Sequence, residues 1–589
     1  MINNSIFIHP ATYFILGAVL LPFLKRFKLL QKIIMIIIPL LAFYQINYLP
    51  DTFGVCEYMG FKLIFGKVDK LTYVFLHVFT LMAVIGNVYG LHVKETGQRM
   101  AGLLYVAGSL GVTLAGDYLT LFIFWELMAF ASVFLVWYRK KKQSIQAGYR
   151  YLLVHTAGGL ILLGGIFLRY QNIHDLSFTQ IAVNGATFAD YLIMIGFMLN
   201  AAVPPIHAWL PDAYPEATVT GAVFMCAFTT KTAVYVLARA FPGFEALAIL
   251  GAIMTLYGVG YAVIENDARR ILAYHIVSQV GYMVCGIGIG TAMAINGTCA
   301  HAYAHILYKA LLFMGAGAVL EMTGRSKLSE LGGLYKYMPL TLIFTVIGGI
   351  SISGFPFTSG FISKSMIIAA AGEHHRLGLM IMMTLAAVGT FLSVGIKLPY
   401  FIWFGKDSGV KAQDPPWNML LGMFIAGFMC FFLGVYPEYL YRMLPYDVAY
   451  HPYTMYHLSE TLQILGFTGL GFYFMVKYLK PEAHANLDVD WFYRKGALVF
   501  MWLASKPIGI ANEWVGNVYK TVGLRFTMAV AKALSWFDWE GIDWVIDGSA
   551  RGVVNGGDQM RGFQTGKVQH YIGGAVVVLS IVLIVVVLL

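Results

Sequence analysis

Long apolar runs of roughly 20 residues recur along the whole chain, and short polar segments separate them. A helix of about 20 apolar residues spans the hydrocarbon core of a bilayer. The pattern therefore predicts an all-α polytopic membrane protein with about sixteen spans. The predicted spans lie near residues 7–24, 30–49, 70–91, 99–115, 118–138, 148–168, 190–206, 217–240, 245–264, 270–290, 292–320, 338–370, 377–403, 416–436, 459–478 and 570–589.

Two of these spans are interrupted by helix-breaking residues. One contains NAAVPPIHAWLPDAYPEA at 200–217, and the other contains GISISGFPFTSGFISKS at 349–365. Broken helices in matching positions of two halves are typical of transporters built from inverted repeats. The backbone groups that each break leaves free need water or protein around them. We therefore expect each break to face a polar cavity.

Two further segments do not fit a membrane span. Residues 50–69 are too polar, and we expect a short hairpin on the outer surface. In residues 481–568, tryptophans alternate with charged residues, which is typical of helices that lie along a membrane interface. These tryptophans are Trp491, Trp502, Trp514, Trp536, Trp539 and Trp544.

Charge and cysteine content narrow the class of protein. Only 12% of the residues are charged, whereas a soluble protein has about 25%. The net charge of +10 is explained by basic residues between alternate spans, such as the run 139–142, so nucleic acid is not an expected partner. The positive-inside rule then places the N-terminus outside and residues 481–568 on the cytoplasmic side. The five cysteines form no CxxC pair, which argues against an iron–sulfur cluster or a disulfide framework in this chain.

The segment HAYAHILYK, residues 301–309, carries ionisable groups inside an apolar span. His301, His305 and Lys309 share one helix face because each lies four residues from the next. Hydrogen bonding between helices is one interpretation, and a metal site is another, since HxxxH can bind zinc. The metal interpretation lacks an adjacent glutamate, and a protonated Lys309 would repel a cation. A proton relay fits better, because histidine exchanges protons near neutral pH and burial lowers a lysine pKa.

A few other ionisable residues also lie within predicted spans, where such groups cost several kcal/mol. Glu126, Lys231 and Lys364 are the main candidates, and His155 and Lys397 are secondary ones. Each has a simpler interpretation. Glu126 can form a structural ion pair, His155 can be a core histidine, and Lys397 can extend to the interface. Together with the histidines, these groups predict a lateral polar path at membrane depth.

Three motifs resemble those of a known family. They are WLPDAY at 209–214 with Lys231 in KTAVYVLAR, DARRILAYHIVSQVGYM at 267–283, and HAYAHILYKALLFMGAG with GFPFTSGFISK. Over roughly residues 60–405 the chain resembles the antiporter-like subunits of respiratory complex I and of Mrp-type cation/proton antiporters. The tail, with DWEGIDWVIDGSARGV and TGKVQHYIGGAVVV, resembles the end of the distal, long subunit of complex I.

The resemblance implies a particular architecture. It comprises about 14 core helices with two inverted five-helix repeats and broken helices 7 and 12, followed by C-terminal spans and a lateral amphipathic helix. The implied divisions are N-terminal helices with the outer hairpin at 1–115, half-channels at 116–265 and 266–405, additional helices at 406–480, the lateral region at 481–568 and an anchor at 569–589.

The resemblance also implies roles by position. Glu126 matches the glutamate of the fifth helix, Lys231 the connecting lysine, Lys364 the lysine of the broken twelfth helix, and His301, His305 and Lys309 the central relay. The chain departs from the family pattern at two positions. Asn200 stands where the family usually has a lysine, seven residues before His207 of the HAWLP motif. Arg269 replaces a common lysine, which keeps the charge without a titratable group.

The resemblance implies a proton (or sodium) translocating membrane subunit of a redox-driven, complex I-like pump. The chain has no redox motif, so any oxidoreductase activity, of the NADH:quinone or hydrogenase-like kind, belongs to peripheral partner subunits. Iron–sulfur clusters or quinone are expected there, and no cofactor or metal is expected in this chain. Further antiporter-like membrane subunits are expected partners in a prokaryotic cytoplasmic membrane. One alternative is an Mrp-type Na⁺/H⁺ antiporter complex. The other is the coupling subunit of an ion-gradient-driven inorganic-carbon uptake system.

Overall fold

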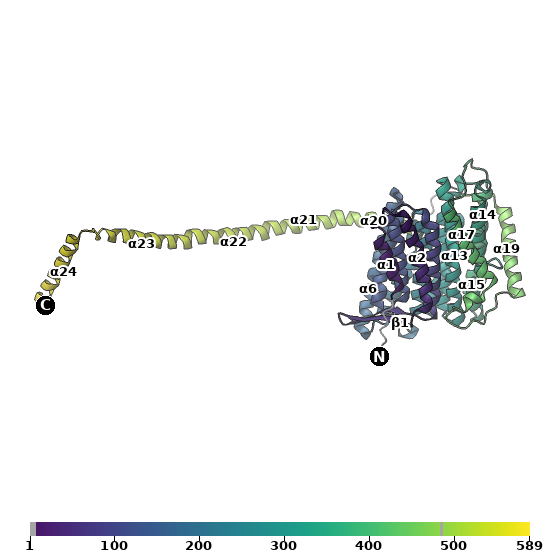
Figure 1. The fold of residues 1–589 in the computed structure, drawn as a ribbon, viewed down its shortest axis with the longest axis horizontal. Coiled ribbons are helices and arrows are strands. Elements are labelled where there is room, and N and C mark those ends of the chain that lie inside the picture. Colours follow the sequence, from purple (N-terminus) through teal and green to yellow (C-terminus); the bar gives the residue numbers. More distant parts are fainter. Residues whose placement is uncertain (1–7, 483–486) are drawn as a thin grey trace. The chain divides into compact units, whose positions relative to one another are not determined.

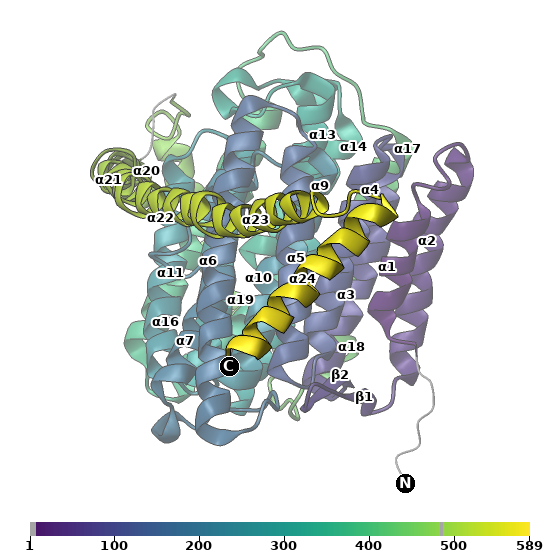
Figure 2. The same ribbon diagram turned by 90° about the vertical axis from the view of Figure 1, so that its left-hand side faces the viewer.

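The structure, a computed structural model, describes residues 8–482 and 487–589. It divides into two units, Met1–Asp490 and Trp491–Leu589. In the first unit, long helices lie side by side and roughly parallel (Figure 1; Figure 2). Residue 7 of the first predicted span and residues 483–486 of the predicted interfacial region lie outside the described residues.

The helices of the first unit coincide with the predicted spans. In chain order they are α1 (Pro10–Leu20), α2 (Lys28–Gln45), α3 (Lys70–Tyr89), α4 (Thr96–Leu114), α5 (Tyr118–Trp137), α6 (Lys142–Ile173), α7 (Phe188–Asn200), α8 (Trp209–Ala213), α9 (Val219–Ala227), α10 (Thr229–Ala240), α11 (Glu245–Ile264), α12 (Ala268–Ile289), α13 (Ala292–Thr323), α14 (Pro339–Ser353), α15 (Ser359–Glu373), α16 (Leu377–Thr390), α17 (Trp417–Val435), α18 (Glu438–Tyr441) and α19 (Met455–Met475). Short 3₁₀ turns are η1 (Ile46–Tyr48), η2 (Gly90–His92), η3 (Val183–Gly185), η4 (Leu328–Glu330) and η5 (Leu334–Lys336), and π-helical turns η6 (Phe391–Lys397) and η7 (Tyr400–Phe404) follow α16.

Among the described residues, 11 helices are long and apolar enough to cross a membrane, which confirms the polytopic helical fold. Several begin at an aspartate whose carboxylate accepts backbone N–H groups: Asp69 before α3, Asp117 before α5 and Asp267 before α12. Such caps satisfy donors that a helix start otherwise leaves without partners. The two inverted repeats implied by the resemblance stay a prediction.

Both predicted helix breaks are present. α7 ends at Asn200, and the next short helix begins only at Trp209, after Pro204 and Pro205. α14 ends at Ser353 because Gly354 has φ of 76°, a conformation that favours glycine. The sequence pattern missed a third interruption, between α9 and α10 at Phe228. A threonine pair follows it, and threonine side chains compete with helical hydrogen bonds.

The predicted surface hairpin is confirmed. Strands β1 (Thr52–Tyr58) and β2 (Phe61–Lys67) pair antiparallel, with Thr52 opposite Lys67. Met59 and Gly60 form the two-residue turn, both with positive φ, which matches the twist of the paired strands. Asp117, at the start of α5, holds the hairpin by accepting the Ile64 N–H at 2.7 Å.

Several basic loops meet at one end of the first unit, here called the basic end. Lys140, after α5, pairs with Glu95, which precedes α4, at 2.7 Å. Lys327, after α13, pairs as an isolated β-bridge with Asp267 at the start of α12. These contacts bring together the loops whose charges the positive-inside rule assigned to one side.

The second unit is almost entirely helical. It contains α20 (Asp490–Leu503), α21 (Gly509–Val518), α22 (Arg525–Trp536) and α23 (Trp544–Arg561), joined by the π-helical turns η8 (Ala504–Ile508), η9 (Tyr519–Leu524) and η10 (Phe537–Asp543), and then α24 (Val568–Leu588). Residues 490–561 thus form one run without a break in helical structure. At 1.5 Å per residue it measures roughly 110 Å. The helical character predicted for this region is confirmed, and its position along an interface stays a prediction.

Candidate functional site

Five ionisable side chains from three helices form what we call the central row. Lys231 comes from α10, His301, His305 and Lys309 from α13, and Lys364 from α15. His305 lies within electrostatic range of the other four. The rings of His301 and His305 have centroids 6.1 Å apart, and His301 Nδ1 lies 3.3 Å from Ser363 Oγ, next to Lys364. The structure thus brings together the residues that the sequence placed on separate helices.

The central row is buried, and much of it lacks a protein partner. His301, His305, Lys309 and Lys231 have no exposed surface, and Lys364 is only 4% exposed. Among the described residues, both ring nitrogens of His305 and the Nζ of Lys309 lack a hydrogen-bond partner. A buried polar group without a partner costs about 1–3 kcal/mol, and more if it is charged. Such groups are normally satisfied by internal water.

Two lysines of the row are fixed by carbonyls at helix interruptions. Lys231 Nζ donates to Cys226 O at 2.7 Å and to Thr230 Oγ1 at 3.0 Å, beside the break between α9 and α10. Lys364 Nζ donates to Ile352 O at 2.8 Å, at the end of α14, and lies 5.3 Å from the ring centroid of Tyr282. The breaks therefore expose carbonyls that hold ammonium groups at membrane depth.

The sequence-based selection missed His275 on α12. It is fully buried, its Nε2 lies 2.7 Å from Ser393 Oγ, and it is within electrostatic range of Lys309 and Lys364. The same signal that singled out HAYAH was present, since His275 lies in the apolar run RILAYHIVSQVGYM. His275 has no second histidine four residues away, so the spacing pattern did not select it.

Glu126 lies apart from the central row. It is half-buried on α5, and its Oε1 faces Gly159 of α6 and finds no partner among the described residues. α5 and α6 are neighbours on one side of the first unit (Figure 2).

Three of the secondary candidates, His155, Asn200 and His207, lie at or next to the first helix break. His155 of α6 is buried against the rings of Tyr151 and Trp209, with centroids 4.1 and 4.5 Å away. It lies next to Asn200, the last residue of α7, without a well-formed hydrogen bond between them. His207, in the loop after the break, is fully buried and lies 3.3 Å from Asp488. Both ring nitrogens of His155 lack a hydrogen-bond partner among the described residues, so a satisfied core histidine at this position stays a prediction.

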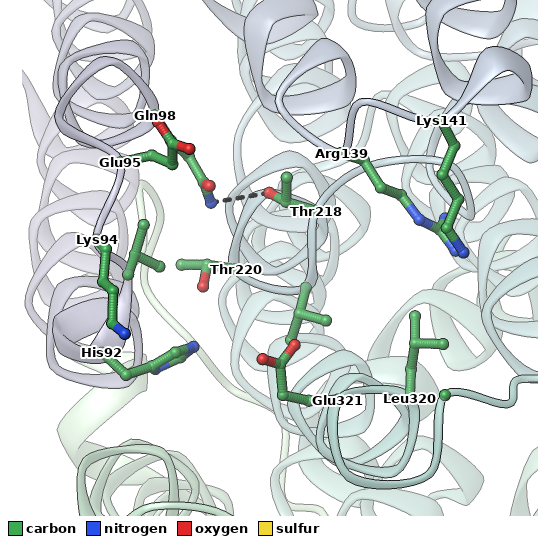
Figure 3. Close-up of a pocket in the computed structure, with 13 residues that line it drawn as sticks. His92, Lys94, Glu95, Gln98, Arg139, Lys141, Thr218, Thr220, Leu320 and Glu321 are labelled. Carbon is green, nitrogen blue, oxygen red and sulfur yellow. Dashed lines mark hydrogen bonds between the residues drawn. The ribbon is translucent and has the colours of Figure 1, made fainter.

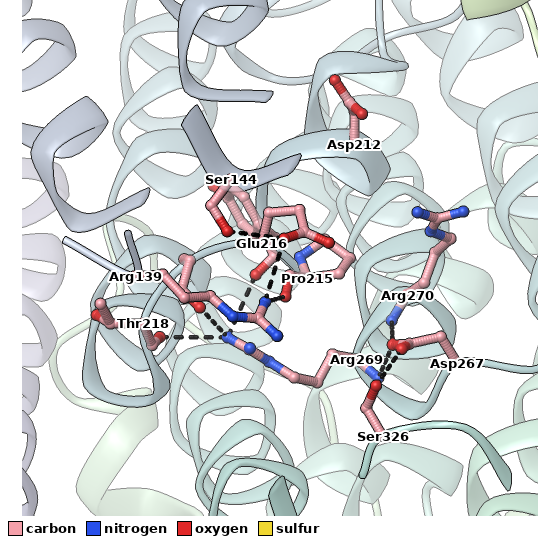
Figure 4. A network of polar contacts seen from close by, with 12 residues as sticks. Arg139, Ser144, Asp212, Pro215, Glu216, Thr218, Asp267, Arg269, Arg270 and Ser326 are labelled. Atoms are coloured by element: carbon pink, nitrogen blue, oxygen red, sulfur yellow. Dashed lines mark hydrogen bonds and ion pairs between the residues drawn. The ribbon is translucent and has the colours of Figure 1, made fainter. Parts of the chain in front are cut away.

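Arg269 and Lys397 are held by backbone carbonyls. Arg269 Nη2 donates to Ala217 O at 2.9 Å and to Thr218 O at 3.2 Å, in the turn before α9. Arg139 also contacts this turn, where it pairs with Glu216 (Figure 4). Lys397 donates to Val263 O at 2.5 Å and Glu265 O at 3.2 Å, near the end of α11, and is 2% exposed. Lys397 is therefore buried against the end of α11, and both of its interpretations, relay member and residue that extends to the interface, stay predictions.

Two cavities lie in the first unit. One, of about 480 Å³, opens at the basic end beside Glu321 near the end of α13 and is shown in Figure 3. The other, of about 340 Å³, reaches Lys364 and the second break, so this break faces a cavity as predicted, although much of the cavity surface is apolar. Its further polar lining comes from Tyr450, His451, Thr454, His457, Glu460 and Thr461. His301 lies near Lys364, and Glu321 lies twenty residues further along α13. Twenty helical residues correspond to about 30 Å.

Within the described residues, no group of three or more His, Cys, Asp or Glu side chains could hold a metal ion. The histidines at 301 and 305 have lysines as charged neighbours. The chemistry available to the central row is therefore proton binding and charge displacement.

Comparison with known proteins identifies the family. Residues 115–393 match the family described as NADH:quinone oxidoreductase/Mrp antiporter, transmembrane. NADH-quinone oxidoreductase subunit N of Desulforudis audaxviator is 30% identical over 380 residues, which cover 59% of this chain and 75% of that protein. The chain belongs to the NADH:quinone oxidoreductase/Mrp antiporter family.

Other members of the NADH:quinone oxidoreductase/Mrp antiporter family match different lengths of the chain. F(420)H(2) dehydrogenase subunit L of Methanosarcina mazei is 26% identical over 600 residues, 88% of this chain and 87% of that protein. Na(+)/H(+) antiporter subunit A1 of Staphylococcus haemolyticus is 31% identical over 380 residues, 57% of this chain, and the match spans only 47% of that longer relative. The solved structure of the Mrp complex from Dietzia sp. shares the fold, with a TM-score of 0.68 and 20% identity over 79% of this chain and 98% of the solved chain.

Proposed function

We propose that this chain translocates protons, or sodium ions, across the membrane as one subunit of a multi-subunit complex. The observation that carries the proposal is the central row, in which buried histidines and lysines from three helices act on one another electrostatically. Their unpartnered nitrogens favour a hydrated line at membrane depth. A purely structural set of buried groups would be satisfied by protein partners.

Access to the row is supported by the two cavities. The basic-end cavity is lined by His92, Lys94, Arg139, Lys141, Glu95 and Glu321. The second cavity contains Lys364 itself together with His457 and Glu460. An ion entering at one end and leaving at the other would pass along α13. By the positive-inside rule the basic end is cytoplasmic, which places the N-terminus and the hairpin outside in a prokaryotic cytoplasmic membrane.

The row works by coupled charge. Each proton added to one member raises the cost of a proton on its neighbours, so the row titrates as a unit. Glu126, at the periphery of the unit, is where a charge change in an adjacent membrane subunit would enter. A shift of that charge would alter proton occupancy at Lys231, and the change would propagate through Lys309 to Lys364.

The driving force is proposed to come from partner subunits. One relative that matches nearly the whole chain is named as a subunit of F(420)H(2) dehydrogenase, which supports a redox-driven pump. Electrons would then pass through peripheral subunits that carry iron–sulfur clusters or bind quinone. The antiporter relatives support the second candidate, a gradient-driven Mrp-type Na⁺/H⁺ antiporter complex. A coupling subunit of an inorganic-carbon uptake system is a third.

The test uses the intact complex in proteoliposomes. Lys309→Ala and Glu126→Gln should each lower ion translocation at least tenfold, because each removes a charge that the row needs, while the complex still assembles. His155→Ala should change translocation less than threefold, because His155 packs as a core side chain. A pH-sensitive dye reports proton movement, and ²²Na⁺ uptake distinguishes sodium.

Normal translocation by both Lys309→Ala and Glu126→Gln would contradict the proposal. The subunits that co-purify decide between the candidates. Iron–sulfur or hydrogenase-like subunits favour the redox-driven pump, and only small membrane subunits favour the antiporter. A large soluble zinc protein favours carbon uptake.

A further inference from the structure

Asp488 is a buried carboxylate in the segment that leads into α20, and the sequence motifs did not single it out. Its side chain is 4% exposed. Tyr274 of α12 donates to Oδ2 at 2.6 Å, Tyr257 of α11 donates to Oδ1, and His207 Nε2 lies 3.3 Å from Oδ1. Three parts of the first unit, including the first helix break, therefore converge on one carboxylate.

Aromatic packing reinforces the attachment. Tyr257, Tyr261 and Tyr274 stack in sequence, with centroid separations of 4.7 and 5.2 Å. Tyr261 also donates to the backbone oxygen of Leu487 at 2.8 Å. The Asp488 carboxylate in addition accepts the Val489 N–H at 2.6 Å. Consecutive residues of the segment are thus held on α11 and α12, and α20 begins at Asp490.

His207 is the member of the cluster that belongs to the first break. Its ring lies edge-on to Tyr257, with centroids 4.6 Å apart. Nδ1 finds no partner among the described residues, and the Nε2 contact with Asp488 falls short of hydrogen-bond geometry. The Asp488 carboxylate is therefore the charged group placed directly against this imidazole.

Other charged groups act on the same cluster. Arg270 and Glu265, at the adjoining ends of α12 and α11, lie within electrostatic range of Tyr274. Asp212 of α8, which forms an ion pair with Arg150 of α6, acts on Arg270. These charges set the background field, but the carboxylate of Asp488 is the one in contact with His207.

The ionisation of Asp488 favours this arrangement. Burial alone would raise the pKa of its carboxyl, but His207 and the hydroxyls of Tyr257 and Tyr274 hold the pKa below its ordinary value. A depressed pKa means that the attachment is complete at neutral pH and weakens only as the pH falls toward the acid range. Asp488 thus carries its charge at neutral pH.

We propose that Asp488 is a positioning residue that fixes the segment leading into the long helix to the first helix break and supplies the counter-charge for His207. The segment at 487–489 would then be held to the first half-channel by charge as well as by packing. A displacement of this segment would withdraw a negative charge from the first break. The inference rests on the proposed function, because it assigns the contact a part in ion translocation.

Asparagine at position 488 separates attachment from charge. An amide has nearly the same shape and can still accept a hydrogen bond from one tyrosine, but it carries no charge for His207. In the intact complex, Asp488→Asn should lower ion translocation at least fivefold. It should also speed hydrogen exchange of the amides at 487–489 at least tenfold. Asp538→Asn, the same change at an exposed position of η10, should alter neither measurement more than twofold.

A double-variant comparison tests the pairing itself. If Asp488 acts through His207, His207→Gln combined with Asp488→Asn should translocate no more slowly than His207→Gln alone. Losses that multiply in the double variant would overturn the pairing, and so would wild-type translocation by Asp488→Asn. If Asp488→Asn fails to accumulate, His207→Gln provides the test, because it leaves Asp488 its tyrosine donors. His207→Gln should then lower translocation at least fivefold, as expected for Asp488→Asn. Normal translocation by His207→Gln would overturn the inference.

Lys309→Ala, measured alongside, separates this inference from the proposed function. Normal translocation by Lys309→Ala contradicts the proposed function whatever Asp488→Asn does. Loss in Lys309→Ala together with wild-type behaviour of Asp488→Asn contradicts only the role of Asp488.

Discussion

Arg269 illustrates how a buried cation can be structural in a chain built around titratable ones. Its guanidinium is 1% exposed and donates to carbonyls in the turn that joins α8 to α9. It thereby ties α12 to the end of the first broken helix (Figure 4). Since Arg269 does not titrate, its charge is constant and its contribution is to geometry.

At the residue scale we predict that Arg269→Lys destabilises the protein while keeping the charge. All three carbonyl contacts come from Nη2, and the shorter lysine side chain does not carry its ammonium to the same position, so hydrogen bonds at a buried site are lost. The expected cost is about 1–3 kcal/mol, measured as a lower midpoint of thermal unfolding in detergent. Arg270→Lys is the matched control, since no side-chain hydrogen bond of Arg270 occurs among the described residues. Equal midpoints for both variants would contradict the role of Arg269.

At the scale of elements, the pair α11 and α12 depends on backbone contact. Gly251 and Gly258 of α11 face Gly281 and Ser278 of α12 so closely that no side chain fits between the helices. Small residues that let helices approach closely are typical of membrane helix packing. The same pair carries Tyr257 and Tyr274, so the contact also sets the spacing of the tyrosines that hold Asp488.

Gly258→Val should force the two helices apart. A Cβ at Gly258 would lie 2.5 Å from Ser278 N, which is backbone and cannot move aside. Overpacking of this kind costs about 1–3 kcal/mol. Gly260→Val is the control on the same helix, because a Cβ there meets no atom within 4 Å. Thermal unfolding should separate the variants clearly, and similar unfolding of both would show that the contact is not tight.

At the scale of the whole molecule, the second unit has no core of its own. The large apolar side chains along α20 to α24 are exposed, for example Trp514 at 66% and Phe526 at 69%. Apolar surface of this extent on a helix marks an interaction with lipid or other subunits. The first unit, in contrast, contains continuous clusters of buried side chains.

A chain that ends after residue 490 should fold but should no longer bind the neighbouring membrane subunits. The first unit keeps its core and should unfold within about 5 °C of the full-length chain, since a change below about 1 kcal/mol moves the midpoint by only a few degrees. The membrane subunits that co-purify with the full chain should be lost or reduced at least fivefold, as quantified by mass spectrometry. A chain that ends after residue 562 tests α24 alone. Full recovery of partners by the shorter chain would contradict an assembly role for the second unit.

Much of this architecture follows from the sequence because membrane insertion leaves few choices. Apolar length predicted all 11 helices of the described residues that can cross a membrane, whereas the total of about sixteen spans stays a prediction. Proline and glycine predicted both main breaks, and the spacing of four predicted that His301, His305 and Lys309 share a face. The break at Phe228 was missed because residues 222–240 contain neither proline nor glycine. The contacts of Lys397 with the end of α11 could not be predicted, because they join positions more than 130 residues apart.

The sequence by itself determined that the chain is helical, crosses the membrane many times and buries ionisable groups, because the free energy of transfer into lipid depends on local composition and period. Only the tertiary structure decided which of those groups act on one another. Lys231 and Lys364 meet the histidines of α13, Glu126 lies apart, and Asp488 contacts tyrosines more than 200 residues earlier in the chain. Such contacts arise from how helices pack, and packing depends on shape complementarity between segments that no local pattern encodes.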